Sequence, residues 1–206
     1  MRVLWLGGST CAGKTTVACL LAAEHGLRLY SCDDAFEEHR RRARPERHPG
    51  FCRIMDLSGP ELCALPVEDQ VEGLTGFYQD QMEMIVEDLL HLPGSGPILA
   101  EGSGLLPDLV APFLTDPGDL GRALWLIATP EFRRSQYPER GSWVREAPED
   151  VFQRWMQRDD ILAARRSERA AALGLAVLSV DGSLSIAETA ATVARRLGIE
   201  RELSGH

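Results

Sequence analysis

A glycine-rich segment near the start of the chain carries the residues with the clearest chemistry. It matches the pattern G-x4-G-K-[ST] in full, as Gly8, Ser9, Thr10, Cys11, Ala12, Gly13, Lys14 and Thr15. Glycines in such a loop let successive backbone N–H groups turn towards phosphate oxygens, and a following helix N-terminus adds partial positive charge. Lys14 is the only lysine of the chain, since its 22 Lys and Arg residues are otherwise arginines. We therefore predict that residues 8–16, Thr16 included, bind nucleotide phosphates, with Lys14 on the β- and γ-phosphates and Thr15 on Mg²⁺.

The elements around this loop have the order that a phosphate-binding loop requires. The apolar run 3–6 predicts a buried strand, and the Ala- and Leu-rich segment 15–25 predicts a helix that ends at Gly26. Short apolar runs predict further strands at 27–30, 97–100, 124–127 and 176–180, with helices at 70–90 and 185–197 between or after them. This alternation predicts a doubly wound α/β sheet, in which ligands gather at the C-terminal ends of the strands.

Three carboxylates stand shortly after predicted strands. Asp33 and Asp34 follow the second strand, where one could act as a base on a hydroxyl nucleophile and the other could serve Mg²⁺. The alternative is that one of them caps the next helix. Glu101 follows the third strand, and it would lie beside the glycine loop as a metal-serving carboxylate if that strand neighbours the first. The alternative for Glu101 is a solvated loop residue.

Arginines are concentrated late in the chain, where they could form a lid over the transferring phosphoryl group. They are Arg133, Arg134, Arg140, Arg145, Arg154 and Arg158. We expect about two of them to touch phosphate, with Arg154, Arg158 and Arg133 as the candidates, and the others to form ordinary ion pairs. A second basic run, Arg40–Arg42 with Arg44 and Arg47, is interleaved with glutamates, which favours a solvated helix face over an anion site.

Together these motifs resemble those of the P-loop small-molecule kinases, the group that includes adenylate, shikimate and uridine kinases and chloramphenicol phosphotransferase. The segments that carry the resemblance, besides the glycine loop, are Ser31-Cys32-Asp33-Asp34-Ala35-Phe36, Leu99-Ala100-Glu101-Gly102 and Arg154-Trp155-Met156-Gln157-Arg158-Asp159. The resemblance implies a three-layer α/β fold with five parallel strands in the order 2-3-1-4-5 and a helical lid. It also implies ATP and Mg²⁺ as cofactors, Asp33 at the acceptor hydroxyl, Glu101 at the metal and a lid that contains Arg154 and Arg158.

The predicted organisation is a single kinase-like domain over residues 1–206, with 37–95 as the acceptor-binding helical region and 130–170 as the lid. The expected reaction moves the γ-phosphoryl group of ATP to a hydroxyl of a small molecule. Residues 37–95 match no motif, so a nucleoside, a sugar, an antibiotic or a cofactor precursor all remain open as acceptor. The alternatives are a nucleoside-monophosphate kinase and a regulatory ATP-binding module that acts on a protein partner.

The net charge, the apolar runs and the cysteine content limit the kinds of partner and compartment that we expect. A net charge of -9 argues against a dedicated binder of nucleic acid or of anionic membranes, and no apolar run approaches the ~18 residues of a membrane span. The five cysteines are odd in number and form no CxxC pair, which indicates reduced thiols in a cytoplasmic protein. We expect a monomer or a homodimer.

Overall fold

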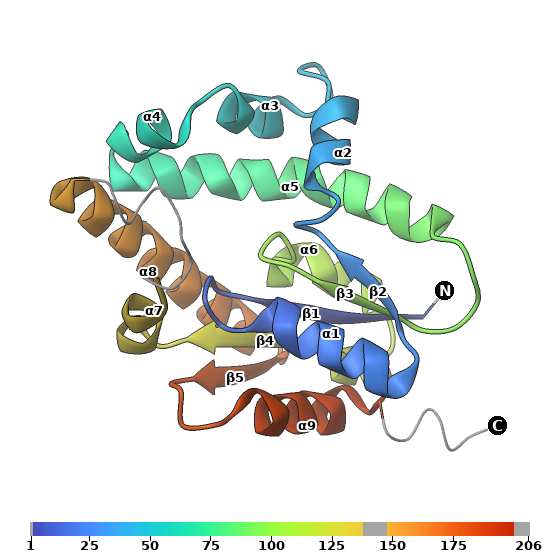
Figure 1. Cartoon of the computed structure of the whole chain (residues 1–206). Coiled ribbons are helices and arrows are strands. Elements are labelled where there is room, and N and C mark those ends of the chain that lie inside the picture. The colour runs from blue at the N-terminus through green and yellow to red at the C-terminus, as the bar shows by residue number, and fades with distance from the viewer. Residues whose placement is uncertain (1, 138–147, 200–206) are drawn as a thin grey trace.

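The computed structural model describes residues 2–137 and 148–199, and its centre is a five-stranded sheet. All the strand pairs are parallel, and the strand order is β2-β3-β1-β4-β5, which confirms the predicted topology (Figure 1). The strands are β1 (Val3–Gly8), β2 (Arg28–Ser31), β3 (Ile98–Glu101), β4 (Ala123–Ala128) and β5 (Ala176–Val180). Each lies within two residues of a predicted strand.

The first strand runs further than its apolar residues predict, because two glycines continue it. Gly7 and Gly8 pair with Trp125 and Leu126 of β4. A Cβ atom on Gly8 would lie 2.0 Å from the Leu126 carbonyl oxygen, and the φ angle of Gly8 is +144°. Only glycine permits this close approach, so Gly8 joins the end of β1 to the start of the phosphate loop.

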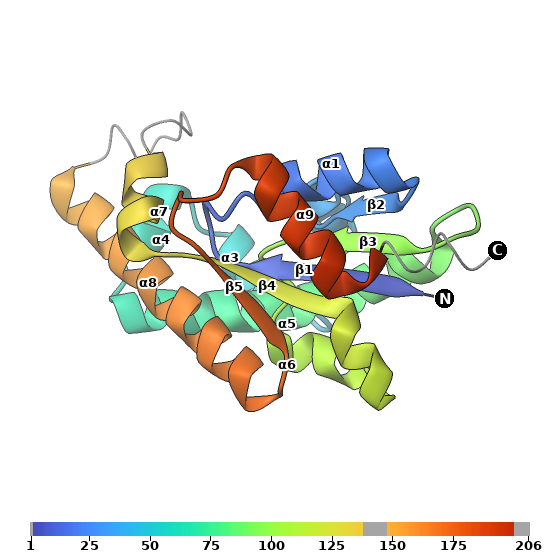
Figure 2. The ribbon, with the colours of Figure 1, turned by 90° about the horizontal axis from the view of Figure 1, so that it is seen from below.

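Helices cover both faces of the sheet, because alternate residues of each strand point to opposite faces. Leu4 and Leu6 pack with α1 (Lys14–His25) and α9 (Ile186–Leu197). Val3 and Trp5 pack on the opposite face with α5 (Val67–His91) and the end of α8 (Glu149–Ala172). Figure 2 shows these helices on the two sides of the sheet, so the predicted three-layer α/β fold is confirmed.

Four helices between β2 and β3 form an arch over one edge of the sheet (Figure 1). They are α2 (Phe36–Arg42), α3 (Pro49–Met55), α4 (Gly59–Ala64) and α5. A cluster of Phe36, Phe51, Phe77 and Met84 holds α2, α3 and α5 together, with the rings of Phe51 and Phe77 stacked at 4.5 Å. Helix α5 begins at Val67, three residues before the prediction, because Val67 extends its apolar stripe onto Leu162 of α8.

The remaining elements complete the two outer layers. Helix α6 (Pro107–Val110) and two 3₁₀ turns (Ala111–Phe113 and Pro117–Arg122) lead into β4, and α7 (Pro130–Gln136) follows β4. Helix α9 has the predicted position, with Ser185 and Glu188 as a capping box at its start and left-handed Gly198 at its end. None of the helices within the two described ranges has the length and apolar character to cross a bilayer.

A buried polar network fixes α2 against β2 and α5. The Tyr30 hydroxyl donates to Asp88 Oδ2 at 2.8 Å, and His39 Nε2 lies 2.9 Å from the same oxygen. Arg42 pairs with the other oxygen of Asp88 at 2.7 Å, and the Gln81 amide nitrogen lies 3.3 Å from His39 Nδ1. Because an amide nitrogen can only donate, His39 accepts at Nδ1 and carries its proton on Nε2. Burial lowers the pKa of His39, against the opposing effect of Asp88, so the ring is held neutral.

We expect this network to make folding stability depend on pH. Since the pKa of His39 is lower in the folded state, the unfolded chain binds the extra proton first as the pH falls below about 6.5. The free energy of unfolding should then fall by up to about 1.4 kcal/mol per pH unit until the folded-state pKa is reached. Chemical denaturation from pH 7.5 to 5.5 measures this slope. The variant His39→Gln should show a flatter dependence, and two parallel curves would show that His39 does not cause it.

Candidate active site

The glycine loop forms a concave backbone between β1 and α1. Cys11 and Gly13 both have left-handed conformations, with φ angles of 61° and 75°, and Gly13 is the N-cap of α1 without any side-chain cap. Such alternation turns backbone N–H groups to one side, as an anion-binding nest requires. Ser9 is fully buried and anchors the loop to β4, since its Oγ accepts from the Ala128 N–H at 2.8 Å. Lys14 opens the helix, and its Nζ donates to the Ser9 carbonyl at 2.8 Å.

Thr15 and Glu101 meet at the end of the neighbouring strand, as the motif spacing predicts. The Thr15 hydroxyl lies 3.3 Å from each carboxylate oxygen of Glu101. Glu101 is 0 % exposed, which rules out the alternative of a solvated loop glutamate. Burial raises the pKa of Glu101, and hydrogen bonding by Ser31 and the charge of Lys14 act in the opposite direction. The structure thus brings Lys14, Thr15 and Glu101 together.

Tight packing at the ends of β2 and β3 explains the glycine after Glu101. A Cβ atom on Gly102 would lie 2.6 Å from the Cβ of Cys32, whose side chain is buried. The Cys32 N–H donates to the Glu101 carbonyl at 3.0 Å and continues the ladder past the last residues of the strands. Gly102 therefore lets the chain segments that carry Glu101 and Asp33 lie side by side.

Asp33 and Asp34 are exposed beside this pair of strand ends. Helix α2 begins at Phe36 with Ala35 as an N-cap that has no side-chain hydrogen bond, so neither aspartate caps it. Within residues 2–137 and 148–199, neither carboxylate has a hydrogen bond or an ion pair, although the Asp34 N–H donates to Ser31 Oγ at 3.3 Å. The charge of Asp33 contributes to the raised pKa of both Cys32 and Glu101, which places its carboxylate within electrostatic reach of the buried pair. The structure shows no contact between Asp34 and either Thr15 or Glu101.

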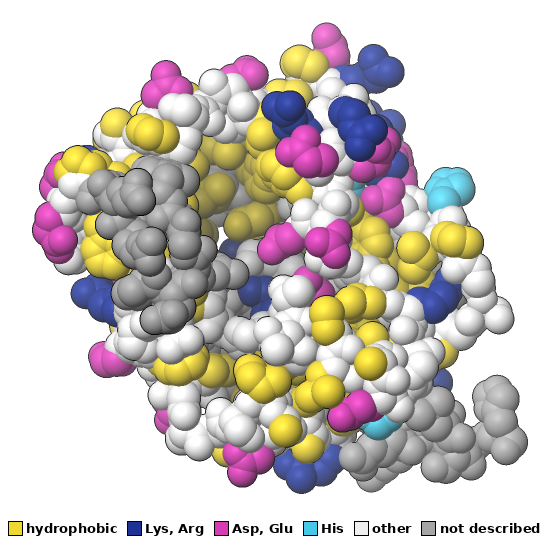
Figure 3. Space-filling view, in the orientation of Figure 1, with side chains coloured by type: hydrophobic (Ala, Val, Ile, Leu, Met, Phe, Trp, Pro, Cys, Tyr) yellow, Lys and Arg dark blue, Asp and Glu magenta, His cyan; other side chains and the backbone are white. Residues whose placement is uncertain are grey.

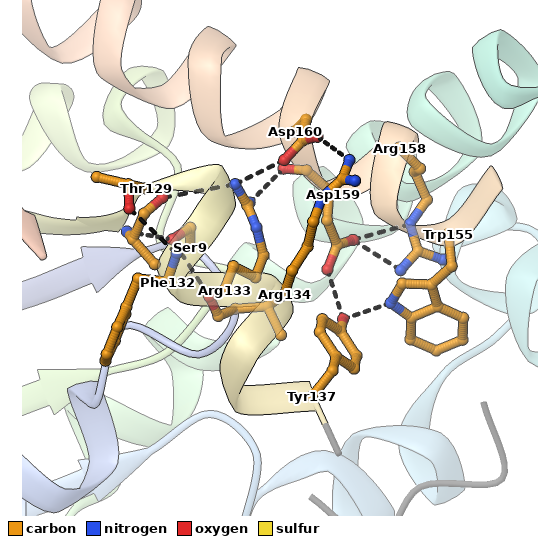
Figure 4. Close-up of polar contacts among 12 residues, drawn as sticks. Ser9, Thr129, Phe132, Arg133, Arg134, Tyr137, Trp155, Arg158, Asp159 and Asp160 are labelled. Atoms are coloured by element: carbon orange, nitrogen blue, oxygen red, sulfur yellow. Dashed lines mark hydrogen bonds and ion pairs between the residues drawn. The ribbon is translucent and has the colours of Figure 1, made fainter. Parts of the chain in front are cut away.

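Two of the candidate arginines belong to a buried network between α7 and α8 (Figure 4). Arg133 is 1 % exposed, donates to the Asp159 carbonyl at 2.8 Å and pairs with Asp160 at 2.8 Å. Arg158 pairs with the Asp159 carboxylate at 2.7 Å and lies over the Trp155 ring at 4.2 Å. Burial alone would raise the pKa of Asp159, but the Arg158 charge and the Tyr137 hydroxyl outweigh it and hold that pKa below its ordinary value.

The remaining arginines that the sequence singled out are not part of the buried core of this network. Arg154 pairs with Asp150 and donates to the Cys63 carbonyl of α4 at 3.0 Å, and Arg134 reaches Asp160. Arg140 and Arg145 lie outside the described residues, as does the middle of the predicted lid. In the second basic run, the residues that pair with nearby glutamates are Arg40 with Glu37, Arg41 with Glu38, and Arg47 with Glu83 and Glu87. The predicted solvated helix face is thus formed by Arg40 and Arg41, whereas Arg42 pairs with Asp88 and Arg44 and Arg47 lie beyond the end of α2.

Sequence reasoning missed two residues of the site. Ser31 supports the Glu101 carboxylate, and Asp159 is the counter-ion of Arg158. Ser31 could have been found from its place as the last residue of β2, in register with Glu101. Asp159 could have been found from its place next to Arg158 in the Arg-Asp pair. Among the described residues, no group of three or more His, Cys, Asp or Glu side chains could hold a metal ion.

The molecule is hollowed on the face where these groups lie. Figure 3 shows the hollow between the helical arch and the edge of the sheet, with hydrophobic side chains on its upper wall and basic side chains in its depth. The glycine loop leads into α1 below this hollow, and α2–α5 lie above it (Figure 1). The hollow thus has the glycine loop on its lower side and apolar side chains on its upper side.

Solved structures of small-molecule kinases are similar to this chain in fold. Shikimate kinase from Acinetobacter baumannii, in complex with shikimate, is 17% identical, with a TM-score of 0.55 and coverage of 98% of this chain and 96% of that one. Deoxyadenosine kinase from M. mycoides with bound dATP is 12% identical, with a TM-score of 0.51 and coverage of 96% and 100%. A gluconokinase from Sinorhizobium meliloti is 13% identical, with a TM-score of 0.51 and coverage of 100% and 97%.

The chain therefore has the fold of the P-loop small-molecule kinases over its whole length. The expected resemblance is confirmed at the level of fold, since these identities are too low to carry an activity across. No protein-family model matches the sequence, and no curated protein matches it.

Proposed function

We propose that this protein is an ATP-dependent phosphotransferase that moves the γ-phosphoryl group to a hydroxyl of a small molecule. The proposal rests on one observation: Lys14 and Thr15, at the end of the glycine loop, lie beside the buried carboxylate of Glu101. A buried carboxylate next to a loop of inward-turned N–H groups suits a nucleotide with its cation. A glycine turn with an incidental surface lysine would need none of these contacts.

The loop residues Gly8, Ser9, Thr10, Cys11, Ala12, Gly13, Lys14, Thr15 and Thr16 would hold the phosphates of ATP. Lys14 would exchange its bond to the Ser9 carbonyl for the β- and γ-phosphate oxygens, where a compact ammonium fits. Thr15 and Glu101 would hold Mg²⁺, and Asp34 would act on it indirectly from its exposed position beside the end of β2. The raised pKa of Glu101 supports this fit, because a buried carboxylate with one nearby cation gains from a second one. When bound, Mg²⁺ would neutralise charge on the phosphates.

Asp33 would orient or deprotonate the acceptor hydroxyl. Its exposed carboxylate has no partner within the described residues, and it lies within electrostatic reach of Glu101. Those two features leave it available to a substrate and close to the phosphoryl group that the loop would hold. The hollow with its apolar roof, within residues 37–95, would receive the body of the acceptor.

Arg133, Arg154 and Arg158 would close over the transferring group as part of a lid over residues 130–170. All three are held by carboxylates or backbone carbonyls, so phosphate contact requires an exchange of partners. Arg158 binds the Asp159 carboxylate through Nε and Nη2, so a phosphate would compete with Asp159 for these two donors. Asp159 would then keep Arg158 charged and oriented between turnovers.

An acceptor panel with ADP release as the readout tests the proposed reaction. The structural neighbours act on shikimate, deoxyadenosine and gluconate, so these three head the panel, followed by other nucleosides, hydroxylated antibiotics and cofactor precursors. We expect at least one compound to accelerate ADP release, because the site has a place for an acceptor beside Asp33. A rate stimulated only by nucleoside monophosphates would instead establish the alternative of a nucleoside-monophosphate kinase.

The lid leads to a separate prediction about dynamics. Amides between residues 133 and 169 should exchange more slowly with solvent when a bisubstrate analogue is bound, because arginines that bind phosphate would hold α7 and α8 in place. Hydrogen exchange with mass spectrometry measures this protection, with peptides from α9 as the internal control. Equal protection in the free and bound protein would mean that this segment does not close.

A further inference from the structure

Gln81 has a buried side chain whose carbonyl oxygen is left without a hydrogen bond. The residue belongs to α5, is 3 % exposed, and has its amide nitrogen 3.3 Å from His39 Nδ1. No described residue donates a hydrogen bond to its Oε1, yet this oxygen is not sealed from solvent, whereas the oxygen of Gln70 on the same helix is. The phosphoryl transfer proposed above does not use Gln81 Oε1.

The neighbours of Gln81 determine which way its amide is turned. Burial acts to raise the pKa of Asp88, but three hydrogen bonds and the Arg42 charge outweigh it and hold this pKa below its ordinary value, so Asp88 is ionised. An ionised carboxylate only accepts, so His39 Nε2, at 2.9 Å from Asp88, carries the proton. The neutral His39 ring then has only a lone pair at Nδ1, and Gln81 must present its NH₂ group there. The carbonyl oxygen therefore points away from His39.

Gly104 shows where this oxygen points. A Cβ atom on Gly104 would lie 2.7 Å from Gln81 Oε1 and 3.3 Å from Cδ1 of the partly exposed Tyr78. Any side chain here would cover the oxygen, so the glycine leaves it open. Gly104 follows Glu101 by three residues, which places the contact where α5 crosses the carboxyl end of β3.

The Gln81 oxygen and the Asp33 carboxylate are presented at the same end of the sheet. Gly102 lets the segment after β3 pack on Cys32, the chain neighbour of Asp33, and α5 lies above the hollow (Figure 1). Asp33 is charged and exposed, whereas the Gln81 oxygen is neutral and largely buried. A neutral buried oxygen favours one hydrogen bond from a hydroxyl or an N–H, and an apolar or anionic group there would leave it unpaired.

We propose that Gln81 determines substrate specificity by accepting a hydrogen bond from a second donor group, a hydroxyl or an N–H, of the alcohol that is phosphorylated. The inference rests on the proposed phosphotransferase reaction, in which Asp33 takes the reacting hydroxyl. It narrows the substrate class to molecules with a further donor beside that hydroxyl, which polyols and N–H-bearing heterocycles have and simple alcohols lack. His39 acts through Gln81 and is a positioning residue.

Steady-state kinetics with the fastest substrate of the acceptor panel, and with its derivatives methylated at each non-reacting hydroxyl or N–H, test this recognition. We expect the native protein to prefer the substrate over one of these derivatives by at least about tenfold in kcat/KM. In Gln81→Leu that preference should fall below about threefold. The KM for the substrate should rise at least about tenfold with kcat nearly unchanged, because the lost bond serves binding. Gln79→Leu, at an exposed position of α5, is the matched control and should keep the native values.

A second pair of variants keeps the test valid if Gln81→Leu folds poorly. Gly104→Ala leaves the Gln81 amide in place and covers its oxygen, so it should raise KM in the same way. Gly121→Ala, where a Cβ atom would meet nothing within 4 Å, is its control. Gln81→Glu keeps one oxygen beside Gly104 while the other pairs with a protonated His39, so it should retain the preference for the unmodified substrate.

Nitrogen-15 spectra of the native protein test the orientation separately, and His39 should be the tautomer protonated at Nε2. A His39 ring protonated at Nδ1 would turn the Gln81 NH₂ group towards Gly104 and overturn the inference. Turnover of a panel substrate with native KM and native preference in Gln81→Leu, or in Gly104→Ala, would overturn it as well and leave the phosphotransferase reaction intact. If no panel compound is phosphorylated, the proposed reaction itself fails, and this inference fails with it.

Discussion

Replacing Lys14 by alanine should lower kcat/KM by about 10³-fold or more, which corresponds to ~4 kcal/mol of lost transition-state stabilisation. Lys14 is the cation at the N-terminus of α1, and its Nζ lies on the inner side of the loop, bonded to the Ser9 carbonyl. No other lysine exists to replace it. Without the ammonium, negative charge that spreads over the phosphoryl oxygens would be met by backbone N–H groups and Mg²⁺ only.

The test compares three proteins on an acceptor found in the panel. Lys14→Ala should lose activity and nucleotide affinity while its circular dichroism stays native. Lys14→Arg keeps the charge but presents a planar fork in the narrow space beside Ser9, so it should recover little of the rate. An exposed substitution at the other end of α1, Glu24→Gln, should behave as the native protein does. Turnover at the native rate in a folded Lys14→Ala protein would contradict the kinase assignment.

Replacing Asp33 by asparagine should lower kcat by about 10²–10³-fold and leave folding and ATP binding nearly intact. Positioned acid–base groups contribute ~10²–10⁴-fold, and a loose phosphoryl-transfer transition state needs less help from a base, so the lower half of that range applies. The exposed Asp33 side chain has no hydrogen bond or ion pair within the described residues, and it does not cap α2. Its conversion to an amide should therefore change the melting temperature very little.

The neighbouring carboxylate supplies the matched control. Asp34→Asn removes the same charge one residue later, where the Asp34 N–H already bonds to Ser31. If Asp34 serves Mg²⁺ indirectly, the turnover of Asp34→Asn should be restored at higher Mg²⁺ concentration. The turnover of Asp33→Asn should not be restored. Native turnover by Asp33→Asn at ordinary Mg²⁺ would exclude the role at the acceptor hydroxyl.

The fold and the phosphate loop could be predicted because they rest on short-range patterns. Apolar runs of four or five residues identified five strands, and the motif required Lys14 and Thr15 to follow a strand. The position of Glu101 beside Thr15 followed from the strand order, since β3 neighbours β1.

The partners of the arginines could not be predicted, because they depend on how two helices pack. Nothing in the sequence shows that Arg133 reaches Asp160 across 27 positions, or that Arg166, unlike Arg158, is buried without a carboxylate. The start of α5 was missed for the same reason, since Val67 is helical through its contact with Leu162 on α8. The helix-cap alternative for Asp33 was a reasonable local interpretation, and it fails because α2 begins at Phe36, after a turn in which Ala35 holds the cap position.

The fate of the γ-phosphate is the most direct test of the proposed reaction. Phosphorus NMR of the protein with ATP, Mg²⁺ and an acceptor from the panel distinguishes a phosphate monoester from inorganic phosphate in one spectrum. We predict that ADP and a new monoester resonance grow together, that inorganic phosphate stays minor, and that Lys14→Ala produces neither. ADP accompanied only by inorganic phosphate, at a rate that no acceptor changes, would contradict phosphoryl transfer to a hydroxyl and indicate an ATPase module instead.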